Sequence, residues 1–88
     1  MTSDNAAPTR AEIKAMVLQQ LLAVAPDLVG EEIDEHCNFR DQFDFDSMDQ
    51  LHFVAALHER TGVEIPERDY PKLLNINGCI DYLRVRLA

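Results

Sequence analysis

The chain has 88 residues, of which 47% are hydrophobic, and its 16 acidic against 8 basic residues give a formal net charge of −8. This length fits one small domain, and the hydrophobic content excludes a disordered acidic tail. The acidic balance argues against nucleic-acid binding, which needs basic residues to neutralise phosphates. It favours partners with basic surfaces, although solubility alone would also account for the charge.

The sequence lacks recognisable export and membrane signals. Its first ten residues are polar, and no apolar run approaches the ~20 residues that a transmembrane helix requires. Cys37 and Cys79 lie far apart and form no CxxC pair, so neither a metal site nor a redox motif is indicated. We therefore expect a cytoplasmic protein with two reduced thiols and no membrane insertion.

The first predicted helix covers residues 10–25. Thr9 and Glu12 have the spacing of a capping box, and Pro26 ends the helical pattern. Residues 26–45 then lose the helical period, so we expect a long connection across the bundle with one short helical turn near residues 32–37. Its apolar residues are spaced as single contacts with the bundle: Leu28, Ile33, Phe39, Phe43 and Phe45.

A second helix is predicted over residues 47–60, with Gly62 placed for a C-terminal cap. Asp46 and Ser47 both suit its N-terminal cap, so Ser47 falls at a helix start. Free backbone N–H groups and the positive end of the helix dipole favour an attached phosphate there. One buried face is expected from apolar residues that recur at three- and four-residue steps: Met48, Leu51, Val54, Ala55 and Leu57. Met48 itself is expected to be half-exposed, where it could close the hydrophobic pocket or contact a partner beside Ser47.

The C-terminal third predicts one or two helical turns over residues 67–74 and a last helix over residues 76–87, capped by Asn75. The predicted fold is therefore all-α, a small up-and-down bundle of three long helices and one short helix. We assign residues 1–9 to a flexible tail and residues 10–88 to a single domain.

The residues around Ser47 allow more than one interpretation. Ser47 could be only a capping serine, with acidic neighbours that complement the helix dipole. A calcium loop is excluded, since counting from Asp44 places Asp49 where the loop needs Gly and Ala55 where it needs Glu. With no oxyanion-stabilising loop beside a paired nucleophile and base, no enzyme is expected.

Three stretches in order resemble the acyl carrier protein family, also called phosphopantetheine-binding carriers. Residues 39–49 resemble the family's attachment motif, with the Asp-Ser-Met tripeptide at residues 46–48. Residues 61–66 resemble the loop after the second helix, and residues 75–83 resemble the start of the last helix. The resemblance covers nearly the whole predicted domain.

The resemblance implies a carrier without catalysis of its own. A phosphopantetheinyl transferase would attach phosphopantetheine from coenzyme A to Ser47, and the thiol of that arm would hold an acyl group as a thioester. Asp46, Met48 and Asp49 would dock partners: the transferase and an acyl synthetase, ketosynthase or acyltransferase with a basic surface. The implied protein is a monomer in fatty-acid, lipid or secondary-metabolite synthesis, whose bundle could shelter an acyl chain between its helices.

The sequence departs from the family pattern at several positions. Asp44 replaces a usual Gly, and Phe45 is bulkier than the usual residue. His52, His58 and Arg60 stand on a helix that is usually strongly acidic, which suggests a specialised carrier with a narrower set of partners. The histidines could make docking pH-sensitive or could have no role. A peptidyl carrier, or an unmodified carrier-shaped interaction or regulatory protein, remains an alternative.

Overall fold

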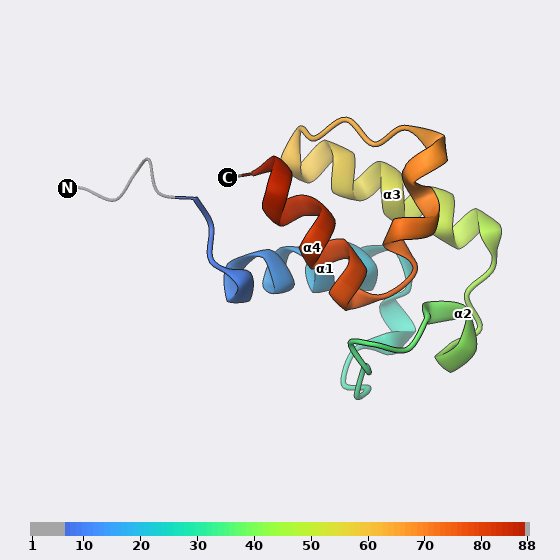
Figure 1. Cartoon of the computed structure of the whole chain (residues 1–88). Coiled ribbons are helices and arrows are strands. Elements are labelled where there is room, and N and C mark those ends of the chain that lie inside the picture. Colours follow the sequence, from blue (N-terminus) through green and yellow to red (C-terminus); the bar gives the residue numbers. More distant parts are fainter. Residues whose placement is uncertain (1–6, 88) are drawn as a thin grey trace.

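The computed structural model describes residues 7–87, which form a helical bundle without strands within that range (Figure 1). This confirms the predicted all-α fold, and each long helix lies within one residue of its predicted bounds. Residues 1–6 of the predicted flexible tail lie outside the described residues. The elements in order are α1 (Arg10–Val24), η2 (Pro26–Leu28), α2 (Phe39–Gln42), α3 (Ser47–Thr61), η3 (Glu67–Leu73) and α4 (Ile76–Arg86).

Helix α1 packs against both α3 and α4. Its predicted capping box is present: the Glu12 backbone N–H donates to Thr9 Oγ1 at 3.1 Å, and the Thr9 N–H donates to Glu12 Oε1 at 2.8 Å. Ile13, Val17 and Leu21 are fully buried on its inner face. These side chains recur at four-residue spacing, so one stripe of α1 faces the other two long helices.

The connection between α1 and α3 differs from the prediction. The short helical turn expected near residues 32–37 is wrong; the chain bends there, and Asp34 Oδ1 accepts the backbone N–H groups of His36 at 2.8 Å and Cys37 at 3.2 Å. An aspartate that binds nearby N–H groups in this way offers the backbone an alternative to helix. The short helix forms instead at α2, where the Phe39 N–H donates to the Leu74 carbonyl at 2.8 Å.

Glu35 fixes the connection to the bundle. Its carboxylate forms ion pairs with Arg10, at 2.8 Å, and with Lys14, and its backbone carbonyl accepts the Asn77 N–H at 2.9 Å. Hydrogen bonds from Arg10 and then Lys14 lower the pKa of Glu35 to about 2. The connection is thereby held to the start of α1 and the start of α4 at the same point.

The segment after α3 contacts α4 through a polar cluster and a close backbone approach. Tyr82 Oη donates to Asp69 Oδ2 at 2.7 Å, and the Arg86 guanidinium lies 3.5 Å from the centre of the Tyr82 ring. The hydrogen bond from Tyr82 lowers the pKa of Asp69. At Gly78 a Cβ would lie 2.5 Å from the Lys72 carbonyl oxygen, so a side chain there would force η3 away from α4.

Neither cysteine forms a disulfide. Cys37 is half-buried, whereas Cys79 is fully buried and its burial raises the pKa of its thiol. A buried thiol that stays protonated behaves as a small apolar core residue. Within the described part of the chain, no helix is long and apolar enough to cross a membrane.

Candidate attachment site

Ser47 is the first residue of α3, and its side chain is exposed. The N-cap is Asp46, whose Oδ1 accepts the Asp49 N–H at 2.9 Å, while the Asp46 N–H donates to Asp49 Oδ2 at 3.2 Å. The interpretation of Ser47 as merely the capping serine is therefore wrong. Because two carboxylates form the cap, the Ser47 hydroxyl is left available for chemistry at the helix start.

The Ser47 hydroxyl faces solvent in a short segment where one buried residue stands among exposed ones. Phe45 is buried, whereas Asp44, Asp46 and Ser47 are exposed. The Gln50 N–H then donates to the Asp46 carbonyl at 3.0 Å, which closes the first turn of α3. A buried ring just before the cap fixes where the chain enters the helix, so Ser47 is presented on a well-supported turn.

The face of α3 that carries the site differs from the predicted one. Its buried residues are Phe53, Val54 and Leu57. Leu51 is 44% exposed and Ala55 is also exposed, so the prediction that they lie on the buried face is wrong, whereas Met48, expected to be half-exposed, is 56% exposed. Residues 48 and 51 are one turn apart, so α3 has a second apolar stripe that runs away from Ser47 on its outer side.

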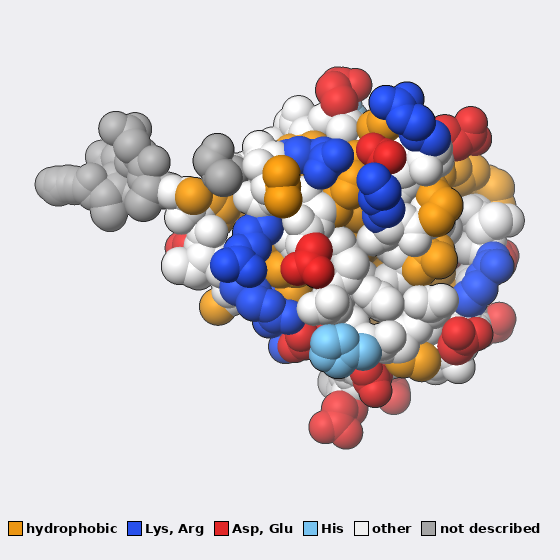
Figure 2. All heavy atoms as spheres, in the orientation of Figure 1, with side chains coloured by type: hydrophobic (Ala, Val, Ile, Leu, Met, Phe, Trp, Pro, Cys, Tyr) orange, Lys and Arg blue, Asp and Glu red, His pale blue; other side chains and the backbone are white. Residues whose placement is uncertain are grey.

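The surroundings of Ser47 are acidic. Asp44 and Asp46 are exposed and Asp49 is half-buried, whereas the exposed Arg40 brings a positive charge to α2. Figure 2 shows acidic side chains at the lower rim, over the connection, and at the right, over α2, with a basic side chain just above them. This distribution agrees with docking of partners that carry basic surfaces.

The two histidines of α3 differ in their contacts. Both are exposed, but His58 Nδ1 lies 2.8 Å from the Val63 carbonyl oxygen. His58 therefore joins the end of α3 to the loop that follows, beside the predicted cap at Gly62, whose φ is 74°. Sequence reasoning missed this contact, although a histidine in the last turn of a helix is typical of C-terminal capping.

Comparison with known proteins indicates a class of protein that fits the geometry of this site. The family described as "Phosphopantetheine attachment site" matches residues 17–83. An acyl carrier protein of Thermosynechococcus vestitus is 32% identical over 77 residues, which cover 88% of this chain and 89% of that protein. An acyl carrier protein of Campylobacter fetus subsp. fetus is 36% identical over 72 residues, covering 82% of this chain and 87% of that protein.

The fold, the exposed hydroxyl and the matched region together define a phosphopantetheine-binding carrier rather than a catalyst. The chain belongs to the acyl carrier protein family. Its prosthetic group is accordingly covalently attached phosphopantetheine. The residues present at the start of α3 fit this group, since they offer an accessible hydroxyl at the positive end of a helix.

Proposed function

We propose that Ser47 is the residue that carries phosphopantetheine. The observation that supports this most strongly is the exposed Ser47 hydroxyl at the first position of α3, in a cap that Asp46 and Asp49 complete without it. In the transfer, Ser47 Oγ would form a bond to the phosphorus of the pantetheine arm. The pyrophosphate bond of coenzyme A would break, adenosine 3′,5′-bisphosphate would leave, and the hydroxyl proton would pass to a base of the transferase.

The start of α3 suits the phosphodiester that results. The dipole of a 15-residue helix favours an anion at its N-terminus by about 0.3–1 kcal/mol at an exposed site. Exposure also gives the transferase access to Ser47. When bound, the prosthetic group supplies a thiol that holds an acyl group as a thioester, activated for transfer or condensation.

The surface around Ser47 defines the proposed docking site. Asp46 and Asp49 would attract basic residues of a phosphopantetheinyl transferase, and Met48 would pack against its apolar surface. Leu51 extends this apolar contact by one helical turn. The same surface would serve an acyl synthetase, ketosynthase or acyltransferase of fatty-acid, lipid or secondary-metabolite synthesis, with residues 10–88 acting as a monomeric cytoplasmic domain.

A loading assay tests the attachment residue. The protein is incubated with coenzyme A and a broad-specificity phosphopantetheinyl transferase, and its intact mass is measured. We expect wild type and Ser3→Ala, which removes the other serine of the chain, to gain one phosphopantetheine. Ser47→Ala should gain none, with helical circular dichroism nearly unchanged because the cap stays intact. A mass gain that persists in Ser47→Ala would overturn the assignment.

A second measurement separates the carrier from an unmodified interaction or regulatory protein. Protein purified from its natural host, with its own transferase present, should carry the mass of one phosphopantetheine. Unmodified protein from that source would favour the regulatory alternative. An aminoacyl group on the recovered thiol would instead identify a peptidyl carrier.

A further inference from the structure

We propose that this carrier keeps its cargo outside the bundle, and that the cargo class is therefore short or polar acyl groups. The inference rests on the proposed attachment to Ser47. The expectation that the bundle shelters an acyl chain requires free or easily freed space behind the attachment site. That space is filled by Phe39, Phe45 and Phe53, here called the phenylalanine cluster.

The phenylalanine cluster lies directly inside the start of α3. Phe45 is two residues before Ser47, Phe53 is on the buried face of α3, and Phe39 begins α2. Their exposed fractions are 6%, 0% and 1% respectively. Ring centres are 5.2 Å apart for Phe39 and Phe45, 5.3 Å for Phe39 and Phe53, and 6.3 Å for Phe45 and Phe53. All three pairs lie at the separations of interacting rings, so the cluster is close-packed.

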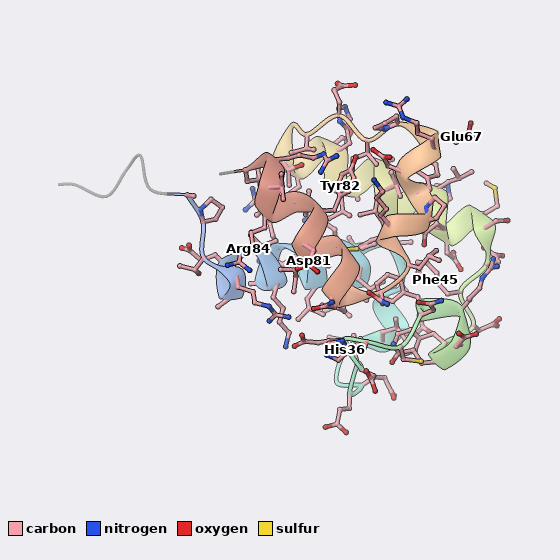
Figure 3. All side chains as sticks on the ribbon, in the orientation of Figure 1. His36, Phe45, Glu67, Asp81, Tyr82 and Arg84 are labelled. Atoms are coloured by element: carbon pink, nitrogen blue, oxygen red, sulfur yellow. The ribbon has the colours of Figure 1, made fainter. Side chains whose placement is uncertain are left out.

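Hydrogen bonds from both α3 and α2 reach the segment that precedes α4. Gln50 Nε2 donates to the Leu73 carbonyl at 3.2 Å, and the Phe39 N–H donates to the Leu74 carbonyl at 2.8 Å. Leu73 is itself fully buried. Figure 3 shows Phe45 between the start of α3, α2 and η3.

The remaining space at this point is small. The cavity at this point has a volume of about 30 Å³ and is lined by Phe39, Arg40, Phe45, Asp46, Gln50 and Leu74. An apolar cavity of about 150 Å³, several times larger, accommodates the six carbons of benzene. A medium-length acyl chain could therefore enter only by displacing a packed ring and breaking a hydrogen bond.

The class of acyl group that suits this carrier follows from the exclusion of the acyl chain from the protein core. An acyl chain that stays in water exposes every methylene group, and the free-energy cost of this exposure grows with chain length. Short acyl groups, and groups with hydroxyl, keto or amino substituents, expose little apolar surface. A carrier whose interior is closed behind the attachment site is suited to these groups rather than to long saturated chains.

Chain-length dependence in the wild-type protein tests the inference. Acetyl and octanoyl forms are made with the transferase and the corresponding acyl-coenzyme A, and intact mass confirms loading. We expect NMR signals of the three rings to be the same in both forms and the two Tm values to agree within about 1 °C. Ring signals that move on octanoylation, with a raised Tm, would overturn the inference. Failure of any group to load would instead contradict the proposed attachment to Ser47.

A matched pair of variants tests the role of the cluster. Phe45→Ala creates space behind Ser47, so its octanoyl form should melt about 4 °C or more above its acetyl form. Phe43→Ala alters a half-buried ring outside the cluster and should show no such difference. Phe45→Leu replaces Phe45→Ala should the latter fail to fold. Equal Tm values for the two acyl forms of a folded Phe45 variant would contradict the assigned role of Phe45.

Discussion

Asp46 combines two functions at the residue scale. Its carboxylate caps α3 through the Asp49 N–H, and it also places negative charge beside Ser47. The cap bond from the Asp49 N–H uses Asp46 Oδ1, so Asp46 Oδ2 can face a basic partner. The fold and the proposed docking surface therefore depend on the same side chain, and a substitution must separate the two effects.

The pair Asp46→Asn and Asp46→Ala provides this separation. Asn caps a helix about as well as Asp, whereas Ala costs about 0.5–2 kcal/mol of stability. We expect urea unfolding to show that loss for Asp46→Ala only, and transferase kcat/KM to fall about 2- to 5-fold in Asp46→Asn as a surface charge pair is lost. Wild-type kcat/KM in Asp46→Asn would show that docking does not use this charge.

At the scale of the element, α3 has two apolar faces with different tasks. The face with Phe53, Val54 and Leu57 supports the core, whereas Met48 and Leu51 face outward. Large exposed apolar side chains in a row mark contact surfaces more often than isolated ones do. The outer stripe begins next to Ser47, so any enzyme that reaches the prosthetic group also meets this stripe.

We therefore expect Leu51→Ala to weaken partner recognition without weakening the fold. Truncation of an apolar contact residue costs on the order of 1 kcal/mol of binding, or about 5-fold in transferase kcat/KM. Stability should change by no more than about 0.5 kcal/mol, since Leu51 is exposed. Val85→Ala, at an exposed position on α4, is the matched control and should load as wild type does. Normal kcat/KM in Leu51→Ala would exclude Leu51 from docking.

At the scale of the whole molecule, the long connection is held in place by polar contacts with distant parts of the chain. Glu35 joins it to Arg10 and Lys14 of α1, and the Phe39 N–H joins it to Leu74. These contacts position α2 and the turn that precedes Ser47. The placement of the attachment site thus depends on ion pairs and backbone hydrogen bonds some distance along the chain from it.

The ion pairs of Glu35 predict that the stability of the fold decreases at acid pH. Folding lowers the pKa of Glu35 from 4.5 to about 2, so the carboxylate contributes stability fully above pH 4.5, and this contribution is lost as the pH falls toward 2. Glu35→Gln should therefore melt below wild type at neutral pH, and the Tm difference should shrink between pH 4.5 and 2. Thermal unfolding followed by circular dichroism measures this.

Glu32→Gln, at an exposed neighbouring position, is the control for a general change in charge. Its Tm difference from wild type should remain small over the same pH range, because within residues 7–87 the Glu32 side chain forms none of the ion pairs that hold Glu35. A constant difference between wild type and Glu35→Gln from pH 7 to pH 2 would contradict the stabilising role of the ion pairs.

The sequence by itself determined the features that depend on neighbouring residues. The capping box of Thr9 and Glu12, the caps at Asn75 and Gly62, and the bounds of the long helices all follow from local hydrogen bonds and helical periodicity. For the same reason Ser47 could be placed at a helix start from its neighbours alone. Three motifs in order also sufficed to indicate the family.

Only the tertiary structure decided which local possibility prevailed where several were open. Both Asp46 and Ser47 could cap α3, both apolar stripes of α3 could be buried, and residues 32–37 could form a turn of helix. Local hydrogen bonds made the first and last choices: Asp46 pairs with Asp49 at the cap, and Asp34 accepts the N–H groups of His36 and Cys37. Contacts with α1, far away in the sequence, selected the buried face of α3, because burial depends on which surfaces meet rather than on sequence spacing. The same long-range packing brought the phenylalanine cluster together behind Ser47 and closed the interior there.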